Sequence, residues 1–457
     1  MNLKQISRWT KGTIIQGDPT QNFKIFNMDS RLSQPGELFF ALTAARNGHE
    51  FISQAWEKGA SGAVVSQKVS APDKNFSMIQ VHDTLQALQN LAKNAIQERK
   101  IQVIGITGSI GKTTTKEFLA SILKRKYKLM KSEGNFNNHI GVPLSILKLQ
   151  KEHELAVLEM GMSAPGEIKV LTDIAPPDVS IITNIHPVHM EFFESLDKIA
   201  LAKKELLDGT KPQGTAVLNR DNKLVRKISK DFKGEKIYFG LNSASDIRAE
   251  NIRRQGMDGM TIDLVYGSEK INLFLPFIYE SYLYNFLAAA AAAYIFSLPL
   301  ESIKKSAKNL HPYLMRGSIL HLKDNITLID DSYNSNPSAL ESSLKSIADL
   351  SQGRKVAVLG DMLELGKREN RYHLEAGELV ARLGYGLLIT IGSLGKKIAE
   401  GASGSGMDKT KIHSFQDSNE AASKIAPLLI HGDIVLIKGS RGIKTEKIIN
   451  ILKKRGN

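Results

Sequence analysis

A glycine-rich loop that joins an apolar segment to a helix constrains this chain more than any other feature. Residues 103–115 read VIGITGSIGKTTT, so Gly108 and Gly111 lead directly into Lys112 and Thr113. Glycines allow the backbone to curl until several N–H groups and the N-terminus of the next helix face one anion. The lysine can then reach the β- and γ-phosphates, and the threonine hydroxyl can ligate Mg²⁺. The loop predicts that the chain binds a nucleoside triphosphate with Mg²⁺.

The spacing of this loop departs from the common form G-x-x-x-x-G-K-[ST]. Position 106 is isoleucine, and the glycines fall at 105, 108 and 111, three residues apart. The departure narrows the choice of family. The alternative is an ordinary glycine-rich turn with a surface lysine, and the apolar strand, three glycines, lysine and threonines together disfavour it.

The composition is that of a soluble globular protein. The chain has 457 residues, 42% of them hydrophobic, which is enough for roughly two to four domains with separate cores. There is no cysteine, so a metal must be held by oxygen or imidazole ligands. No segment is apolar enough to span a membrane, so we expect a cytoplasmic protein. The formal charge of +14 is spread along the chain without a basic run, which favours small polyanionic substrates over nucleic acid.

Three blocks with an α/β pattern follow one another along the chain. Residues 1–99 predict a small α/β domain, residues 100–312 a nucleotide-binding domain with a mostly parallel sheet, and residues 313–457 a doubly wound, Rossmann-like α/β domain. A run of alanines after residue 287 indicates a closely packed helix. The strands predicted in the second and third blocks are 155–158, 179–183, 215–218, 327–329, 355–359, 387–391, 411–415 and 434–437.

Polar side chains follow two of the strands predicted in the central block. Glu159 ends one strand, at the edge where open α/β sheets present ligand groups, and is a candidate carboxylate for Mg²⁺. His186 and His189 follow the next strand, and Lys203 lies in a charged helix after it. Each has an ordinary alternative, because single glutamates and histidines and lysine pairs on helices are mostly surface or core residues.

Four segments of the central block together resemble the Mur ligases, ATP-dependent amide-forming enzymes of peptidoglycan precursor synthesis. They are GITGSIGKTT at 105–114, LEMG at 158–161, TNIHPVH at 183–189 and AKKE at 202–205. Four more resemble the family member that adds D-alanyl-D-alanine, namely NFNNHIGVP at 135–143, DDSYNSNP at 330–337, VLGDMLELG at 358–366 and KGSRG at 438–442. The resemblance covers essentially the whole chain. It implies a ligase that joins D-alanyl-D-alanine to a UDP-N-acetylmuramoyl tripeptide while ATP is cleaved to ADP and phosphate.

The resemblance also implies a mechanism. ATP converts a carboxylate into an acyl phosphate, which the dipeptide amine attacks, and charge develops that Mg²⁺, Lys112 and the loop amides can stabilise. The implied metal ligands are Thr113, Glu159, His189 and a carbamoylated Lys203. An ammonium about 4 Å from a divalent ion would be repelled by roughly 8 kcal/mol at an effective dielectric of about 20, whereas a carbamate would be a ligand. The alternative is that Lys203 is an unmodified surface lysine.

Further residues are implied as contacts for nucleotide and substrate. The nucleotide contacts are Gly108, Ser109, Gly111, Lys112, Thr113, Thr114, Asn285 near adenine, Arg316, and Asp330 or Asp331 at the ribose, of which Asp331 is our choice. The family has a His-Asn pair where this chain has Ser281 and Tyr282, so the adenine contact departs from the pattern. The substrate contacts are Ser30, Arg31, Asn47, Gly48 and His49 for the uridine diphosphate end, together with Asn334 and Asn336.

Other motif residues carry no individual assignment. They are Asp361, Glu364, His373, Lys438 and Ser440, and some of them are expected only to cap helices. The partners implied are small-molecule substrates, with no nucleic acid and no membrane insertion, and we expect a monomer.

Four alternatives stay open. Folylpolyglutamate synthetase shares the loop and the ligase logic, and a Mur ligase that adds the third peptide residue is closer, but segments 330–337 and 358–366 disfavour both. A nucleotide-dependent switch is a different class, and a guanine switch would carry an Asn-Lys-x-Asp base reader, whereas Asn222-Lys223 is followed by Leu-Val. A catalytically silent scaffold is disfavoured because the chain retains all four residues of the implied catalytic centre, Lys112, Glu159, His189 and Lys203.

Overall fold

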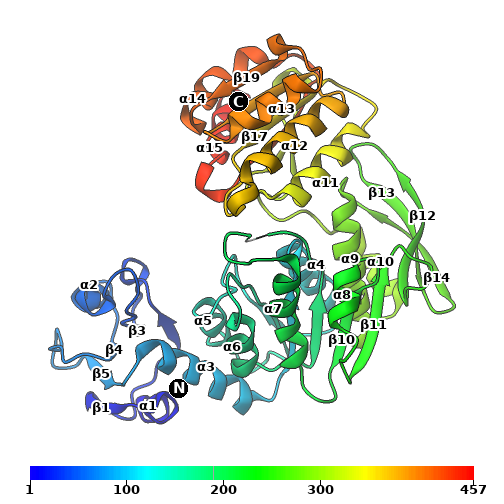
Figure 1. Ribbon diagram of the computed structural model, residues 1–457. Helices are drawn as coiled ribbons and strands as arrows, with labels where there is room; N and C mark the ends of the chain where they lie inside the picture. Colours follow the sequence, from blue (N-terminus) through cyan, green and yellow to red (C-terminus); the bar gives the residue numbers. More distant parts are fainter. Residues whose placement is uncertain (189, 457) are drawn as a thin grey trace.

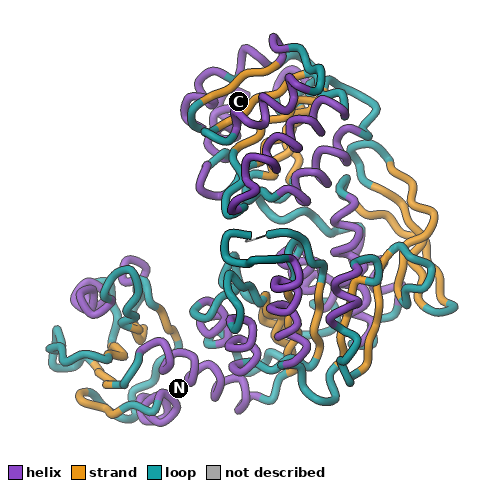
Figure 2. Tube along the Cα trace, in the orientation of Figure 1, coloured by secondary structure: helices purple, strands orange, loops and turns teal. Residues whose placement is uncertain are grey.

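The chain folds around three β-sheets that follow one another in sequence. The computed structural model describes residues 1–188 and 190–456. In Figure 1 the N-terminal part, in blue, lies to one side of the central part, and the C-terminal part, in yellow to red, lies above it. Figure 2 shows helices flanking the strands in each part. The α/β fold with mostly parallel sheets is confirmed, while the domain boundaries after residues 99 and 312 stay predictions.

The N-terminal sheet has five strands in the order β1-β5-β4-β3-β2, with β1 antiparallel to β5 and the other pairs parallel. Helix α3 leads from this sheet to the central one. The elements are α1 (Leu3–Thr10), β1 (Thr13–Gln16), β2 (Ile25–Asn27), η1 (Ser30–Leu32), β3 (Glu37–Phe40), η2 (Gly48–Phe51), α2 (Ile52–Glu57), β4 (Gly62–Val65), β5 (Ser77–Gln80) and α3 (Thr84–Arg99).

The central sheet has nine strands in the order β14-β13-β12-β11-β10-β9-β6-β8-β7. Its strands are β6 (Gln102–Thr107), β7 (Leu129–Lys131), β8 (Leu155–Glu159), β9 (Val179–Ile182), β10 (Thr215–Asn219), β11 (Glu235–Gly240), β12 (Ile247–Arg254), β13 (Met260–Tyr266) and β14 (Glu269–Leu275). Its helices are α4 (Lys112–Leu123), α5 (Gly141–Ile146), α6 (Glu167–Ile174), α7 (Leu196–Asp208), α8 (Lys223–Ile228), α9 (Glu280–Ile295) and α10 (Leu300–Ala307). The three strands predicted here are confirmed within one residue at each end.

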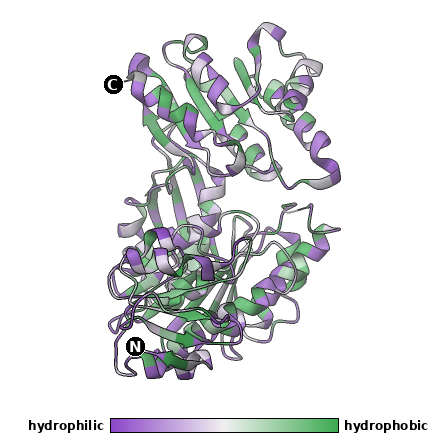
Figure 3. Cartoon of the chain, turned by 90° about the vertical axis from the view of Figure 1, so that its left-hand side faces the viewer, coloured by the Kyte–Doolittle hydropathy of each residue, from purple (hydrophilic) through white to green (hydrophobic). Residues whose placement is uncertain are grey.

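The parallel strands β8, β9 and β10 of the central sheet are buried on both faces, which explains why they read as continuous apolar runs. In β8, Val157 packs into the core on the side of α4 and α9, whereas Ala156 and Leu158 pack into the core on the opposite side. The alanines of α9 are all fully buried beside α4, so the closely packed helix is confirmed. Figure 3 shows this apolar interior and the polar outer surfaces of the helices.

An antiparallel extension of the central sheet was not predicted from the sequence. Strands β12, β13 and β14 pair antiparallel and continue the sheet beyond β11. Their outward faces carry charged residues that pair across strands, such as Lys270 with Glu250 and Asp263. A half-exposed ladder with alternating polar residues gives a weaker apolar signal than the buried parallel strands.

The C-terminal sheet has six strands in the order β15-β16-β20-β17-β18-β19, parallel except for β15 at the edge. The strands are β15 (Ser318–His321), β16 (Thr327–Asp331), β17 (Lys355–Gly360), β18 (Leu387–Ile391), β19 (Ile412–Phe415) and β20 (Ile434–Lys438). The helices are η3 (Lys323–Asn325), α11 (Pro337–Ala348), η4 (Gly366–Arg368), α12 (Glu369–Arg382), α13 (Gly395–Gly404), η5 (Lys409–Lys411), α14 (Ser418–Lys424), η6 (Ala426–Leu428), η7 (Arg441–Ile443) and α15 (Glu446–Gly456). All five predicted strands are confirmed, and β16 continues to Asp331. Within the described residues, no helix has the length and apolar character to cross a membrane.

Candidate active site

The glycine-rich loop between β6 and α4 requires glycine at two positions. Gly108 and Gly111 have φ angles of +152° and +85°, which residues with a side chain rarely adopt. A Cβ at Gly108 would lie 1.9 Å from Oγ1 of Thr183, and one at Gly111 would lie 2.1 Å from Oδ1 of Asn285. Gly111 caps α4 without a side-chain hydrogen bond. The first N–H groups of α4 therefore have no side-chain acceptor from the cap residue, as in helix termini that bind phosphate.

The lysine of the loop folds back over it. Nζ of Lys112 donates a 2.8 Å hydrogen bond to the carbonyl oxygen of Gly108. Burial lowers the pKa of Lys112, and the nearby charge of Arg316 acts in the same direction, while Glu159 opposes the shift. The ammonium is thus held by a neutral carbonyl, which a phosphate oxygen could replace.

The segment that follows β9 holds the loop in place. Oγ1 of Thr183 donates to the carbonyl oxygen of Ile110 at 2.6 Å. The Asn184 side chain accepts from the N–H of Ile110 at 3.0 Å and donates to its carbonyl oxygen at 3.0 Å. Oγ of Ser109 donates to the carbonyl oxygen of His186 at 2.9 Å. Asn184 was missed as a site residue although it lies within the motif TNIHPVH, because an asparagine after a strand is ordinary turn chemistry.

Glu159 lies at the end of β8 and is 2% exposed. Its Oε2 accepts a 2.8 Å hydrogen bond from the hydroxyl of Thr113, and its Oε1 accepts one of 2.8 Å from Nδ2 of Asn137. Nζ of the fully buried Lys116 lies 3.7 Å from Oε2. Neither Asn137 nor Lys116 was singled out from the sequence, since a lysine one turn into an amphipathic helix normally faces solvent.

The oxygen atoms around Glu159 suit Mg²⁺. This ion is commonly held by one or two carboxylates and completes its shell with phosphate oxygens and water, and Thr113 and Glu159 offer two hard oxygen donors at one place. Among the described residues, no group of three or more His, Asp or Glu side chains is arranged to hold a metal. His189, the third ligand implied by the resemblance, lies outside the described residues.

Lys203 lies on α7 and is a buried lysine, not a surface one. Its side chain is 2% exposed, and in the described part of the chain it takes part in no hydrogen bond or ion pair. Burial, reinforced by the charge of Lys112, holds the pKa of Lys203 well below the usual value of 10.5. The interpretation as a surface lysine is therefore wrong. Burial favours the neutral form of the amine, which is the nucleophilic form.

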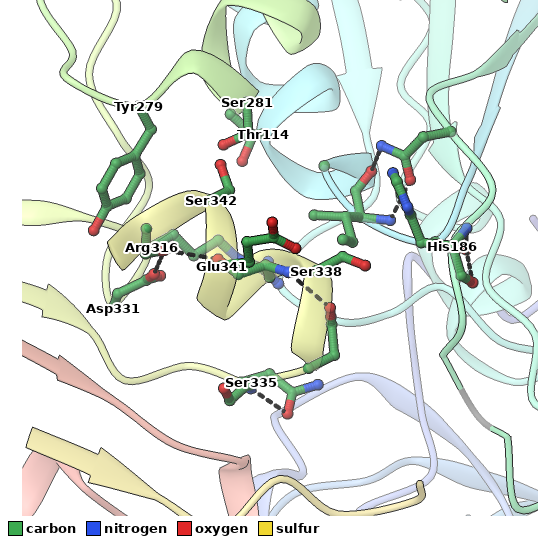
Figure 4. A pocket seen from close by; sticks show the side chains of 18 of the residues that line it. Thr114, His186, Tyr279, Ser281, Arg316, Asp331, Ser335, Ser338, Glu341 and Ser342 are labelled. Atoms are coloured by element: carbon green, nitrogen blue, oxygen red, sulfur yellow. Dashed lines mark hydrogen bonds between the residues drawn. The ribbon is translucent and has the colours of Figure 1, made fainter. Parts of the chain in front are cut away.

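A cavity of about 1090 Å³ lies between the central and C-terminal parts of the chain, beside the glycine-rich loop. The central part contributes the loop, Glu159, His186 and Asn285, and burial lowers the pKa of His186. Figure 4 shows Thr114 and Ser281 on one side of the cavity and Arg316 and Asp331 on the other. Of the described residues in the central and C-terminal blocks that were predicted to contact nucleotide or substrate, all but Gly108 line the cavity. They are Ser109, Gly111, Lys112, Thr113, Thr114, Asn285, Arg316, Asp331, Asn334 and Asn336.

Arg316 enters the cavity from the segment before β15. Its guanidinium lies 4.0 Å from the ring centroid of Tyr333, a cation–π contact. Its Nε is buried and has no hydrogen-bond partner among the described residues. An unsatisfied buried donor costs free energy, so Nε is a position at which a ligand oxygen would fit.

Asp331 ends β16 and is fixed by two donors. Its Oδ2 accepts from Nζ of Lys438 at 2.7 Å and from Oγ of Ser343 at 2.8 Å. Asp330 points elsewhere, since its Oδ1 accepts from the hydroxyl of Ser332 at 2.6 Å and it does not line the cavity. The structure thus favours Asp331 over Asp330 as the residue near a nucleotide.

Several C-terminal motif residues have structural contacts. The N–H of Met362 donates to Nε2 of His373 at 2.9 Å, while Nδ1 of His373 lies 2.7 Å from the carbonyl oxygen of Glu369. Oδ1 of Asp361 accepts from the N–H of Gly395 at 2.6 Å. These contacts hold loops and helix ends in place. Asn336 also caps α11, because its Oδ1 accepts from the N–H of Ala339 at 2.9 Å.

The residues predicted to hold the uridine diphosphate lie in the N-terminal part and do not line this cavity. The hydroxyl of Ser30 donates to Gln54 at 2.6 Å, and the mostly exposed Arg31 pairs with Asp29. His49 is buried, with Nδ1 2.8 Å from Oδ1 of Asn47. A Cβ at Gly48 would lie 2.5 Å from the carbonyl oxygen of Leu42, so this turn needs glycine.

Two family models match this chain. The family described as Mur ligase middle domain matches residues 106–293, and the Mur ligase, glutamate ligase domain matches residues 315–441. The chain is 34% identical to the UDP-N-acetylmuramoyl-tripeptide–D-alanyl-D-alanine ligase of Bacillus subtilis, over 98% of each chain. It is 32% identical to the ligase of the same name from Escherichia coli, over 94% of this chain and 93% of the other.

Solved structures agree. A crystal structure of MurF from Acinetobacter baumannii superposes with a TM-score of 0.90 at 30% identity, covering 99% of this chain and 98% of that one. MurF ligase from Thermotoga maritima in complex with ADP superposes with a TM-score of 0.83 at 28% identity, covering 94% and 97%. The chain belongs to the Mur ligase family.

Proposed function

We propose that the chain is an ATP-dependent ligase that joins D-alanyl-D-alanine to UDP-N-acetylmuramoyl-tripeptide through an amide bond. The observation that carries this proposal is the convergence of the phosphate loop, Glu159, Arg316 and Asp331 on one cavity. The relatives that match over nearly the whole chain bear the name of this activity, and one neighbouring structure holds ADP.

The chemistry explains why the site must bind a triphosphate beside a carboxylate. A carboxylate resists nucleophilic attack because of its charge and because oxide is a very poor leaving group. Transfer of the γ-phosphoryl group of ATP to the tripeptide carboxylate gives an acyl phosphate and ADP. The dipeptide amine then attacks the acyl carbon, phosphate leaves, and the amine loses a proton. Water must be kept out, because it would hydrolyse the acyl phosphate.

We assign the phosphates to the glycine-rich loop. Lys112 would exchange its hydrogen bond with the carbonyl oxygen of Gly108 for a phosphate oxygen, and the first N–H groups of α4 would face the same anion. Arg316 would offer its unpartnered Nε from the opposite wall. Asn285 and Asp331 are assigned to the adenosine end, since both line the cavity.

We assign Mg²⁺ to Thr113 and Glu159, with His189 and Lys203 as further ligands. The hard oxygen donors of the first pair fit this ion. When bound, it would act as a Lewis acid on the phosphoryl oxygens. The lowered pKa of Lys203 favours the neutral form of its amine, which is the form that adds to CO₂ with loss of a proton. The resulting carbamate would supply the oxygen ligand that an ammonium cannot.

We assign the uridine diphosphate end of the substrate to the N-terminal part, at Ser30, Arg31, Asn47, Gly48 and His49. Asn334 and Asn336 are assigned to the peptide end because they line the cavity. Since these groups lie on different parts of the chain, closure of the parts around the substrates is the expected dynamic step. We further propose three domains, at 1–99, 100–312 and 313–457, a monomeric state, no binding of nucleic acid, and action in the cytoplasm.

The test is phosphate release by the purified protein with Mg-ATP. UDP-N-acetylmuramoyl-tripeptide and D-alanyl-D-alanine are added separately and together, and the product is analysed by mass spectrometry. We expect release only when both are present, together with the mass of the UDP-linked pentapeptide. Phosphate release that does not depend on either substrate, or a product with another added residue, would contradict the proposed activity.

A further inference from the structure

We infer that Tyr282 is a positioning residue for Arg316, which it holds at a fixed distance from the phosphate loop. This inference rests on the proposed function, because ATP is the ligand that Arg316 would meet in the cavity.

The first contact is between the Tyr282 hydroxyl and the chain at Arg316. Tyr282 is 7% exposed, and its hydroxyl donates a hydrogen bond to the carbonyl oxygen of Arg316. The next residue, Gly317, has a φ of +75°, and a Cβ there would lie 2.5 Å from Cε2 of Tyr279 and 3.1 Å from the Tyr282 hydroxyl. The backbone therefore passes close to the Tyr279 ring and the Tyr282 hydroxyl. Any side chain at position 317 would push it away from them.

The second contact is between the Tyr282 ring and the helix that begins at the phosphate loop. Phe118 of α4 meets Tyr282 edge to face, with centroids 6.2 Å apart, and stacks on Phe277 at 5.4 Å. Tyr279 also meets Tyr282 edge to face at 5.2 Å. Such pairs favour one relative orientation of the rings. One side chain thus contacts α4 with its ring and the segment entering the C-terminal sheet with its hydroxyl.

The Arg316 side chain depends on where its backbone lies. Its guanidinium is stacked on Tyr333, and its Nε is buried without a partner in the described part of the chain. Its positive charge is close enough to Lys112 to lower the pKa of that lysine. If the carbonyl of Arg316 were released from Tyr282, the guanidinium would sample orientations that do not face the loop. Binding of a phosphate oxygen would then also have to fix the orientation of the Arg316 side chain, and this loss of conformational freedom would weaken the affinity.

The experiment is a double-mutant cycle on ATP affinity, measured by titration calorimetry with Mg-ATP. Tyr282→Phe removes the hydroxyl and keeps the ring, and we expect the Kd for ATP to rise about fivefold, the scale of one net hydrogen bond. In an Arg316→Met background the same change should have less than a twofold effect, because the group being positioned is gone. The KM for ATP should rise in parallel, while the KM values for the other two substrates stay within twofold.

The matched control is Tyr385→Phe. The Tyr385 hydroxyl is buried and donates to the carbonyl oxygen of Leu344 at 2.9 Å, so its loss has a similar cost for folding without touching Arg316. An effect of Tyr282→Phe that persists in the Arg316→Met background, or an equal loss of affinity in Tyr385→Phe, would overturn the inference. Failure of the wild-type protein to bind ATP would instead overturn the proposed function.

Discussion

The hydroxyl of Thr113 and the carboxylate of Glu159 are joined by a 2.8 Å hydrogen bond. Thr113 lies in the first turn of α4, and Glu159 ends β8, the strand next to β6. The bond places a carboxylate beside the positive end of a helix dipole, where it would face the phosphates of a bound nucleotide. The two oxygen atoms are close enough together to ligate the same divalent ion.

Replacing Glu159 with glutamine should remove a metal ligand and leave the fold intact. The amide oxygen can still accept from Thr113, but the NH₂ group faces Asn137. The buried Lys116 keeps only Glu117 as a carboxylate neighbour among the described residues, so we expect a folded protein with a lowered melting temperature. Ligase activity should fall at least about 100-fold, because the stabilisation of phosphoryl charge is lost. Binding of Mn²⁺, followed by electron paramagnetic resonance, should weaken in parallel. Glu301→Gln, on the exposed face of α10, is the control and should behave like the wild type; full activity in Glu159→Gln would refute the metal assignment.

Replacing Gly111 with alanine should damage the phosphate loop specifically. The left-handed φ of +85° costs about 1–2 kcal/mol for a residue with a side chain, and the new Cβ would lie 2.1 Å from Asn285. Gly166 has nearly the same φ, +86°, with open space around it. Both variants should therefore lose stability in thermal denaturation, but only Gly111→Ala should lose ATP binding. Equal loss of binding in both would show that strain alone, and not the contact with α9, is responsible.

Most of the strands that were predicted from the sequence share one physical property, although β19 is only partly buried. The strands β8, β9, β10, β17 and β18 are buried on both faces, so apolar character alone identifies them. The three antiparallel strands β12, β13 and β14 are half-exposed, and polar residues on them, such as Asp263 and Lys270, interrupt the apolar pattern that identifies a buried strand.

The candidate site was predictable where chemistry depends on a local pattern. Gly111, Lys112 and Thr113 follow one another, and Glu159 ends a recognisable strand. Lys116 and Asn137 could not be found this way, because their role depends on long-range packing that brings them to Glu159. The burial of Lys203 could not be predicted either, since the charged residues Lys204 and Glu205 follow it directly.

His373 should make the stability of the protein depend on pH. It is buried, and burial lowers its pKa below 6.5. The unfolded chain therefore binds a proton more readily than the folded one, so the stabilisation is fully present above about pH 6.5 and is lost as the pH falls toward the folded pKa. Burial also lowers the pKa values of His49, His153 and His186. The contribution of His373 to the pH dependence of stability must therefore be isolated by mutation.

The measurement is chemical denaturation of the wild type and His373→Gln at pH 7.5 and 5.5. The variant loses buried hydrogen bonds to Met362 and Glu369, which should cost about 1–3 kcal/mol at pH 7.5. The difference from the wild type should shrink at pH 5.5. The exposed His431→Gln serves as the control. A difference that stays constant or grows at the lower pH would contradict a neutral, buried imidazole.

Replacing Lys203 with methionine should separate stability from activity. The amine is buried and has no partner within the described residues, so an apolar side chain of similar length should leave the free energy of unfolding unchanged or raise it. Activity should nevertheless fall about 100-fold or more, because no carbamate can form to ligate the metal. In the wild type, activity should decline in CO₂-free buffer and return with bicarbonate, and ¹³C-bicarbonate should give a carbamate signal by NMR. Lys198→Met, on the exposed face of the same helix, should keep both activity and bicarbonate dependence. A stable, fully active Lys203→Met protein would contradict the assignment of Lys203 as a carbamoylated metal ligand.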